Sequence, residues 1–377
     1  MLNDGTTRVG IVGCGNILPK YVRGMARFPD LDVVACADAD PGRAVRAAGE
    51  FGLTAATVEE LTARDDIGII VNITPPNAHA AVSLAALEAG KDVYVEKPLA
   101  STAALGADVL AAADRYGRML GAAPDTFLGS AAQTARAALD RGDIGEPVGA
   151  TAFVTHSRAE LWHPDPTFLF RPGGGPVLDM GPYYLTALVA CLGPVSTVYG
   201  ASRIGAPVRT VTAPERRVDT VEVTAPTHAA ATLTFANGVL GTVLMSFDIW
   251  HRTLPHIEVY GTEGVLSLAD PNGYDGPVAV RRHRDADPVT LPPVVPPLAA
   301  PGGPDQLLRG VGVADLAAAR HGGPHRATAR LARHVLEVLE AVQDSGGRAV
   351  PIASTCTRPA PLDHSHGARP LTEEMAR

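Results

Sequence analysis

The sequence predicts an α/β protein in two parts: a doubly wound parallel sheet, then an α+β domain with an open, mostly antiparallel sheet. Short apolar runs alternate with helical stretches from Arg8 to about Ala123, which predicts the first part. After about Pro124, strand-like runs follow one another without intervening helices, which predicts the second. A chain of 377 residues is too long for one ordinary core, so we expect domains at 1–123 and 124–377.

The first part contains apolar runs of strand length with helical stretches between them. Strands that alternate with helices of this size form βαβ units, whose strands are parallel. Gly90 is typical of a helix C-cap, and Asn77 or Thr74 is expected to cap the start of the same helix. The predicted strands are Val9–Val12, Val33–Ala37, Ile67–Ile73, Val93–Val95 and Met119–Ala122, and the predicted helices are Pro41–Gly49, Ala78–Ala89 and Thr102–Tyr116.

The sequence of the second part predicts one helix, then a series of strands and a final amphipathic helix. Asn237-Gly238 between two strand-like runs is a strong hairpin signal, and Thr262–Gly264 resembles another tight turn. An antiparallel sheet can leave one face open, and an open apolar face favours a partner subunit. The predicted strands are Val148–Thr155, Ser196–Ala201, Ala229–Phe235, Gly241–Phe247, His256–Tyr260 and Val265–Leu268, and the predicted helices are Ser130–Asp140 and Ala327–Val342.

Composition and charge exclude several classes of function. The net charge of -8 argues against a non-specific nucleic-acid surface, and the longest apolar runs are far shorter than a membrane span. Met1–Thr7 is short and polar, so no secretory signal is expected. The cysteines are scattered without a CxxC pair, and Cys36 is expected to be buried instead of bridged. We therefore expect a cytoplasmic protein with no nucleic-acid or membrane partner.

A glycine-rich turn follows the first apolar strand. Gly13 and Gly15 suit a tight turn and the close approach of backbone to a pyrophosphate. Leu18 stands where the dinucleotide fingerprint has a third Gly or Ala, so the helix and strand are expected to pack further apart. A simple turn is the alternative, but the position between strand and helix predicts a cofactor site made by Gly13, Gly15, Asn16 and Ile17.

An acidic residue, Asp38, closes the second predicted strand. A carboxylate there can accept hydrogen bonds from the adenosine ribose and repel a 2′-phosphate, which favours NAD over NADP. Arg43 is close enough in sequence to meet a 2′-phosphate, so NADP stays open. A solvated carboxylate, or a cap for the helix begun by Pro41, is the structural alternative.

Two prolines make a rigid loop after the third long apolar strand, at the sheet edge where ligands of α/β proteins bind. Thr74, Pro75, Asn77 and His79 are therefore candidate cofactor-loop residues. A stiff strand-to-helix turn would explain the same residues without a ligand.

A lysine, Lys97, comes directly after a predicted buried strand. Pro98 restricts Glu96 and Lys97 to an extended geometry. A lysine held in this way can bind a substrate hydroxyl and polarise it during hydride loss, whereas an exposed surface lysine is the ordinary alternative. We expect Lys97 to act in catalysis, and Glu96 and Lys97 to border the cofactor.

A glycine run precedes Asp179 and Tyr183 in the second part. If Asp179 begins a helix, the two side chains share one face. Oxidation of a secondary alcohol needs a group that takes the hydroxyl proton, and a tyrosine with a pKa near 10 needs help from a cation such as Lys97. A helix cap and a packing residue are the alternatives.

Four histidines are candidate ligand-binding groups. His251 and His256 flank a predicted strand and could face a sugar-sized ligand. His364 and His366 lack carboxylate or cysteine partners at ligand spacing, so we expect a solvated tail and no metal site.

The motifs GCGN, TPPNAH, EKP and GGGPVLDMGPYY, in this order, resemble the Gfo/Idh/MocA oxidoreductases, the glucose-fructose oxidoreductase and inositol dehydrogenase family. The resemblance runs from about Arg8 to at least Ile352. It implies an N-terminal Rossmann domain and a C-terminal domain whose open sheet forms homodimers or homotetramers. It also implies NAD- or NADP-dependent oxidation or reduction of a sugar, an inositol or a related polyol.

The resemblance also implies roles for individual residues. Lys97 and Asp179 correspond to residues that line the substrate pocket. Many members have a histidine acid/base four residues after the aspartate, whereas Tyr183 stands here, as in the glucose-fructose oxidoreductase branch. A phenol is a poorer base than an imidazole at neutral pH, so three alternatives follow. Lys97 lowers the Tyr183 pKa, another group such as His251 shares the task, or hydride transfer is not the whole function. This DxGxY version marks a distinct subgroup.

Together these features predict an oligomeric, NAD-dependent dehydrogenase or reductase of a sugar, with Tyr183 exchanging a proton, Lys97 polarising the oxygen and Asp179 orienting the substrate. One alternative is a redox-neutral, glycosidase- or lyase-like enzyme that retains its NAD. The other is a non-enzymatic dinucleotide sensor.

Overall fold

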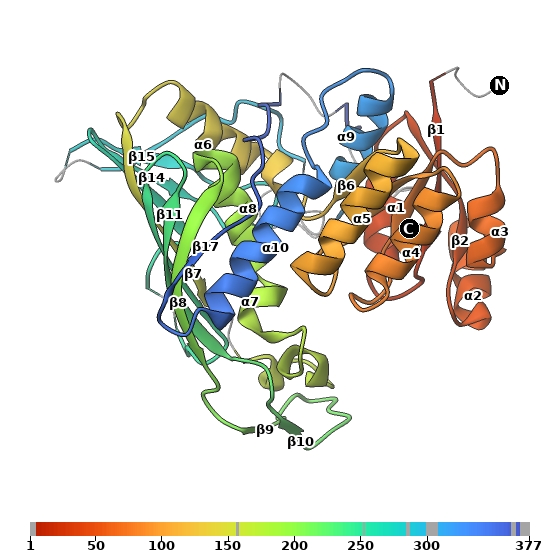
Figure 1. Cartoon of the computed structure of the whole chain (residues 1–377), viewed down its shortest axis with the longest axis horizontal. Coiled ribbons are helices and arrows are strands. Elements are labelled where there is room, and N and C mark those ends of the chain that lie inside the picture. The colour runs from red at the N-terminus through yellow and green to blue at the C-terminus, as the bar shows by residue number, and fades with distance from the viewer. Residues whose placement is uncertain are drawn as a thin grey trace. The chain divides into compact units, whose positions relative to one another are not determined.

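The computed structural model describes two compact units (Figure 1). The first contains Met1–Ser130, Val295–Arg333 and Pro359–Arg377, and the second contains Ala131–Val294 and His334–Arg358. The chain therefore returns to its first unit after building most of the second. The described residues are 5–155, 158–251, 253–283, 287–298, 308–362 and 367–369, so His364 and His366 lie outside them.

The first unit is built on a six-stranded sheet with the order β3-β2-β1-β4-β5-β6, in which every neighbouring pair is parallel. The strand order reverses at β1, which lies between β2 and β4. This arrangement confirms the predicted doubly wound parallel sheet. The strands are β1 (Thr7–Val12), β2 (Leu31–Ala37), β3 (Thr54–Ala56), β4 (Ile69–Asn72), β5 (Asp92–Val95) and β6 (Leu120–Ala122).

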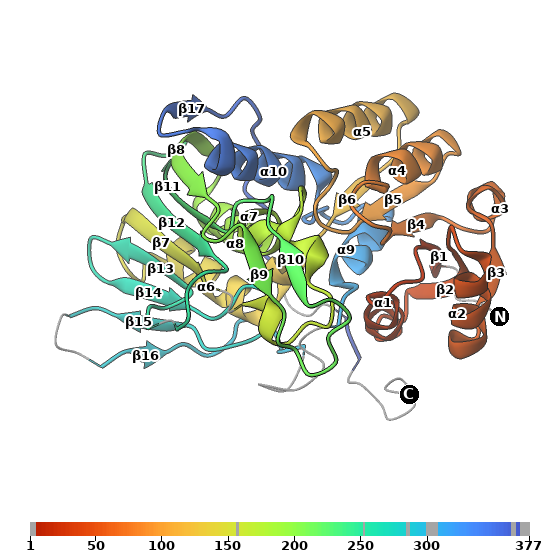
Figure 2. The same ribbon diagram turned by 90° about the horizontal axis from the view of Figure 1, so that it is seen from below.

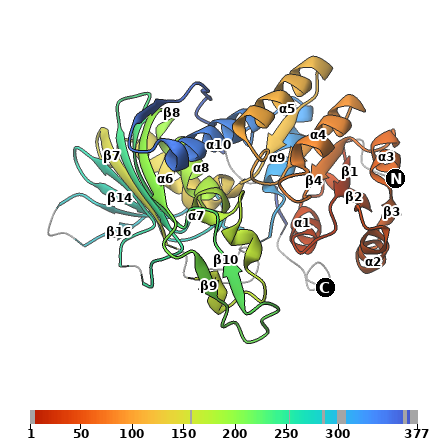
Figure 3. The ribbon, with the colours of Figure 1, turned by 60° about the horizontal axis from the view of Figure 1, so that its bottom comes forward.

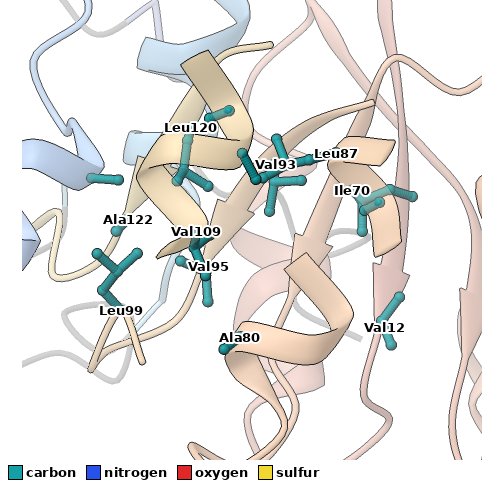
Figure 4. Close-up of a cluster of buried hydrophobic side chains, with 14 of the residues drawn as sticks. Val12, Ile70, Ala80, Leu87, Val93, Val95, Leu99, Val109, Leu120 and Ala122 are labelled. Carbon is teal, nitrogen blue, oxygen red and sulfur yellow. The ribbon is translucent and has the colours of Figure 1, made fainter. Parts of the chain in front are cut away.

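The core of the first unit lies between this sheet and its helices. Figure 4 shows side chains of β4, β5 and β6, such as Ile70, Val93 and Leu120, gathered with Leu87 and Val109 of two covering helices. A strand covered on both faces has no solvent side, so β4 and β5 are buried at every position. The helices are α1 (Leu18–Met25), α2 (Pro41–Phe51), α3 (Val58–Ala63), α4 (His79–Glu88), α5 (Ala103–Tyr116) and α9 (Val311–Arg320).

Several elements of the first unit were not predicted. The short helix α3 is begun by a capping box, in which Thr57 and Glu60 bond each other's backbone N–H groups. Helix α9 comes from the returning segment, and the buried carboxylate of Asp125 accepts a hydrogen bond from the backbone N–H of Gly312 at its start, 2.8 Å. Short elements and long-range caps leave little periodic signal in a sequence.

The second unit is built on a nine-stranded sheet with the order β16-β15-β14-β13-β7-β12-β11-β8-β17 (Figure 2). Its pairs are antiparallel except β7 with β12, which confirms the predicted mostly antiparallel sheet. The Asn237-Gly238 hairpin joins β11 to β12, as predicted. The strands are β7 (Pro147–Thr155), β8 (Val195–Arg203), β11 (His228–Phe235), β12 (Leu240–Ser246), β13 (Ile257–Gly261), β14 (Val265–Leu268), β15 (Ala279–Arg281), β16 (Val289–Thr290) and β17 (Ala349–Pro351).

One face of the large sheet is covered by helices and the other is not (Figures 1 and 2). The covering helices are α6 (Ser130–Asp140), α7 (Gly175–Asp179), α8 (Gly181–Leu192) and α10 (Ala329–Asp344), of which α7 and α8 were not predicted. Burial alternates along β11 and β12, as expected for a sheet with one solvated face. A separate two-stranded sheet, β9 (Val208–Thr210) with β10 (Thr220–Glu222), stands apart from the large one (Figure 3).

All four cysteines are free thiols, and Cys36 is fully buried, as predicted. Within the described ranges, no helix is both long and apolar enough to cross a membrane.

We predict that Gly24→Ala strongly destabilises the first unit. A Cβ at this position of α1 would lie 1.8 Å from the backbone oxygen of Arg309, so the helix or the returning segment must move. The expected loss is about 2 kcal/mol or more in the free energy of unfolding, measured by chemical denaturation. Gly49→Ala in α2 is the matched control, because a Cβ there meets nothing within 4 Å and should be neutral or stabilising by up to about 1 kcal/mol. Equal effects of the two variants would contradict this packing.

Candidate functional site

The glycine turn after β1 has the geometry that close approach of a ligand requires. Gly13 has a φ of 109°, and a Cβ there would lie 2.7 Å from the backbone oxygen of Ile73. Gly15 differs, because a Cβ on it would meet no described atom within 4 Å. Packing within the protein therefore does not require a glycine at position 15. The absence of a side chain there leaves open space beside exposed Asn16. Such space suits a pyrophosphate.

Helix α1 begins at Leu18, directly after this turn, with a proline in its first turn. Ile17 is the N-cap residue, and among the described residues no side chain caps the helix there. The first N–H groups of a helix lack intrahelical acceptors and favour an anion. Leu18 itself is buried, so it serves as a packing residue at the place of the third fingerprint glycine.

The Asp38 carboxylate is fixed by two backbone groups at the end of β2. It accepts hydrogen bonds from the N–H of Cys14 at 2.7 Å and of Asp40 at 2.9 Å. Asp40, and not Asp38, caps α2 by accepting from the N–H of Gly42. Each carboxylate oxygen of Asp38 retains a lone pair for a further donor such as a ribose hydroxyl. Arg43 is exposed and lies 3.6 Å from Asp40.

The loop after β4 is organised by a residue that the sequence reasoning missed, Asn72. Its side-chain nitrogen donates to the backbone oxygen of His79 and to Ser83, and its oxygen accepts from the Thr74 hydroxyl at 2.7 Å. Helix α4 begins at His79 with Ala78 as its N-cap, so the expected caps by Asn77 or Thr74 were wrong. The available signal was a polar residue that ends a fully apolar strand.

The His79 side chain is buried and joins two loops of the first unit. Its Nδ1 lies 2.6 Å from the Pro98 oxygen and its Nε2 lies 2.7 Å from the Thr74 oxygen. Burial lowers the pKa of His79, although the two carbonyl oxygens act in the opposite direction. A neutral ring can donate to one of these oxygens at a time. His79 thus holds the Thr74 loop beside the Lys97-Pro98 segment.

Lys97 follows β5, and a buried side chain also holds the backbone at this position. The Glu96 carboxylate is buried, where it accepts from the Tyr21 hydroxyl at 3.0 Å and from the Lys97 N–H at 2.6 Å. The Lys97-Pro98 peptide is cis, and the Lys97 side chain is only partly buried. The glycine turn, the Thr74 loop and Lys97 all follow carboxyl ends of neighbouring parallel strands, so they share one edge of the sheet.

The second unit carries Asp179 and Tyr183 on two helices instead of one. Asp179 is the last residue of α7, and α8 begins at Gly181 after a break at Met180. The condition for a shared helix face, that Asp179 begins a helix, is therefore not met. Met180 keeps a helical backbone conformation and its oxygen accepts from the Tyr183 N–H, so the break is small. Gly181 is closely packed, because a Cβ there would lie 2.6 Å from the Leu339 side chain.

The neighbouring tyrosines of α8 differ in their surroundings. Tyr184 is buried, and its hydroxyl lies 2.6 Å from Nδ1 of His256, which is 3.8 Å from Asp270. Tyr183 is 7% exposed. His251 is exposed, and the described residues between His251 and His256 form no strand, contrary to the prediction. His256 therefore has a structural partner.

No group of three or more metal-ligating side chains occurs within the part of the chain that the structure describes. The first unit therefore has the strand order of the dinucleotide-binding class of α/β proteins, with the glycine turn and Lys97 at the same sheet edge.

The protein belongs to the Gfo/Idh/MocA oxidoreductase family. Residues 7–123 match the family model described as an oxidoreductase family with an NAD-binding Rossmann fold, and residues 132–267 match the GFO/IDH/MocA C-terminal domain. These matches confirm the resemblance drawn from the motifs and the expected NAD cofactor.

Curated relatives include sugar and inositol enzymes. The chain is 31% identical over 294 residues to dTDP-3,4-didehydro-2,6-dideoxy-alpha-D-glucose 3-reductase of Streptomyces antibioticus. The aligned region covers 76% of this chain and 84% of the relative. It is 38% identical over 164 residues to inositol 2-dehydrogenase 1 of Saccharopolyspora erythraea, 42% of this chain and 48% of the relative.

Solved structures share the fold. An NAD binding oxidoreductase from Klebsiella pneumoniae superposes with a TM-score of 0.78 at 23% identity, covering 93% of this chain and 100% of the other. Levoglucosan dehydrogenase in complex with NADH and L-sorbose superposes with a TM-score of 0.76 at 20% identity, covering 93% and 99%.

We predict that His79→Gln weakens the pH dependence of stability. Because burial lowers the folded-state pKa of His79, the unfolded chain binds more protons below about pH 6.5, and stability falls as the pH falls through that value. Protonation of His79 can change the free energy of unfolding by at most about 1.4 kcal/mol per pH unit. Denaturation between pH 7 and pH 5 should show a smaller decrease for the variant. At pH 7 the free energy of unfolding of His79→Gln should be lower by about 1–3 kcal/mol. The same substitution at exposed His251 should leave it unchanged. An unchanged pH dependence would contradict the assignment.

Proposed function

We propose that the protein transfers a hydride between NAD and a secondary alcohol or ketone carbon of a sugar, an inositol or a sugar derivative. The observation that carries the proposal is the shared sheet edge of the glycine turn after β1 and Lys97 after β5. Ligands of open α/β sheets bind at that edge, where the strand order reverses. Family membership and the sugar and inositol relatives support the substrate class.

The residues present fit a dinucleotide. Gly13, Gly15, Asn16 and Ile17 would hold the pyrophosphate, because Gly15 leaves open space and the start of α1 has no side-chain cap among the described residues. Asp38 would accept from the adenosine ribose, and an aspartate there favours NAD. NADP remains the alternative through Arg43. The supporting loops contribute Thr74, Pro75, Asn77, His79 and Glu96.

NAD supplies the hydride acceptor or donor when it is bound. Lys97 would donate a hydrogen bond to the reacting oxygen and stabilise its negative charge. Tyr183 would take or return the proton at its hydroxyl oxygen, and Asp179 would orient the substrate by accepting from a neighbouring hydroxyl.

The open face of the large sheet supports a proposed homodimer or homotetramer. Tyr199 and Leu240 project from this face and are each 55% exposed. Apolar side chains on an otherwise solvated sheet favour contact with a second copy.

We predict that Lys97→Ala lowers kcat on any accepted sugar by about a hundredfold or more while NAD affinity stays within about twofold. The backbone N–H that bonds Glu96 is kept, so the loop should survive the change. Steady-state kinetics and calorimetric titration of NAD measure the two effects. If NAD binding is lost together with turnover, Lys97 belongs to the cofactor site and not to the chemistry.

We predict that Tyr183→Phe and Tyr184→Phe separate catalysis from stability. Tyr183→Phe removes the proposed acid/base and should lower kcat by about a hundredfold or more without changing the unfolding free energy greatly. Tyr184→Phe removes the bond to His256 and should cost about 0.5–1.5 kcal/mol of stability while kcat stays near that of the unchanged protein. A Tyr183→Phe enzyme with full activity would assign the proton transfer to another group.

A further inference from the structure

The second unit contains a cavity of about 330 Å³ at one end of its large sheet. Arg203 at the end of β8, His228 at the start of β11 and Asp248 shortly after β12 line it, and the pairing of His228 with Arg203 and with Ser246 brings these strand ends together. Arg209 of β9 and Arg158 after β7 complete the lining. Three guanidinium groups around one cavity are unusual in a chain with a net charge of -8.

Arg209 is buried at the base of this cavity and is held by two carboxylates. Its Nη1 donates to Glu160 at 2.9 Å, and its Nη2 forms an ion pair with Asp248. Both Arg209 and Glu160 are almost fully buried. The Thr227 hydroxyl donates to the second oxygen of Asp248 at 2.8 Å and accepts from the Gly205 N–H at 2.8 Å. This network fixes the base of the cavity before any ligand arrives.

The two outer arginines are not neutralised in this way. Arg158 stacks its guanidinium carbon 3.7 Å from the ring centre of Trp250, and its nearest carboxylate, that of Glu160, is 3.9 Å away and already bonded to Arg209. Arg203 is exposed and has no ion-pair partner among the described residues. With three arginines and two carboxylates, the cavity retains positive charge.

The backbone at Arg158 adds a second sign of a ligand site. Its φ of 35° makes it the one non-glycine residue with a positive φ in the described part of the chain. Such strain costs about 1–3 kcal/mol and concentrates at ligand-binding positions. Here it accompanies the placement of the Arg158 guanidinium against Trp250 and at the cavity.

We propose that this cavity binds an anionic group, a carboxylate or a phosphate, carried by the sugar substrate. Guanidinium groups form paired hydrogen bonds with both anions, and the ring of Trp250 keeps the Arg158 fork in place. A volume of about 330 Å³ lies in the range of small-molecule sites. The identity of the ligand as a substrate rests on the proposed oxidoreductase function, whereas the anion site itself rests on the arginines.

The cavity and the segment that carries Asp179 share a framework within the second unit. The Arg209 guanidinium lies 5.5 Å from the ring centre of Phe170, whose backbone oxygen accepts from the N–H of Thr224 and Ala225. The next residue, Pro226, touches the glycine run that leads into α7, since a Cβ on Gly175 would lie 2.5 Å from its oxygen. Figures 2 and 3 show β9 and β10 on the side of the large sheet that carries α7. The Arg209 side of the cavity is thereby connected by packing to the segment that leads into α7.

Calorimetric titration of the full chain with glucuronate, glucose 6-phosphate and glucose tests the proposal. We expect the anionic probes to bind more tightly than glucose, and Arg203→Gln and Arg158→Gln each to weaken only the anionic probes, by about ten- to a hundredfold. Arg282→Gln is the matched control, because Arg282 is exposed and bonds Asp143 elsewhere in the unit. Arg209 is left unchanged because its removal would take from the buried Glu160 carboxylate its hydrogen-bonded cation.

The outcomes separate this inference from the proposed function. Preference for glucuronate identifies a carboxylate site, and preference for glucose 6-phosphate identifies a phosphate site. Equal binding of charged and neutral probes, no binding of either anion, or binding unaffected by both arginine variants overturns the inference. Arginine-dependent anion binding without NAD reduction on any sugar would keep the anion site and contradict the proposed function. Turnover of neutral sugars alone, unchanged in the arginine variants, would support the proposed function and contradict the anion site.

Discussion

The parallel pairing of β1 with β4 is the constraint on which the candidate cofactor site depends. It brings the glycine turn after β1 so close to the loop after β4 that a Cβ on Gly13 would lie 2.7 Å from the Ile73 oxygen. It also aligns the carboxyl ends of β1, β4 and β5, so the turn, the Thr74 loop and Lys97 follow one sheet edge. Strand β2 pairs in parallel with the other side of β1. Asp38, which follows β2, therefore lies at the same edge of the sheet.

Buried polar groups hold this edge in position. Asn72 bonds the Thr74 hydroxyl and the start of α4, His79 connects Thr74 to Pro98, and Glu96 bonds the Lys97 N–H. Asn72 ends β4 and Glu96 follows β5, where backbone N–H and C=O groups leave the sheet and need other partners, whereas His79 is the first residue of α4. The loops that would contact NAD are therefore rigid through their supports and not through their own exposed residues. This makes His79 a supporting residue with no exposed ring nitrogen to offer a ligand.

The two units differ in how far their sequence predicts them. Strand runs such as Val33–Ala37 are apolar throughout because helices cover both faces, so the parallel sheet was predictable from periodicity. The β9–β10 sheet and the return of α9 to the first unit were not, since short strands and long-range packing leave no periodic signal. The break at Met180 was also missed, because it is a short interruption at a residue that keeps a helical backbone conformation. Arg158, Arg203 and Arg209 are far apart in sequence and come together only in the folded second unit.

The most direct test of the account is label transfer in a single turnover. The full chain with NAD is given sugars and sugar acids that carry deuterium on their carbinol carbons, and the nicotinamide product is analysed by mass. The account predicts deuterium on the reduced nicotinamide together with an oxidised sugar. Formation of a cleaved or rearranged sugar without reduced nicotinamide would show a redox-neutral enzyme, and bound NAD without any label transfer would show a sensor; either result would contradict net hydride transfer as the function.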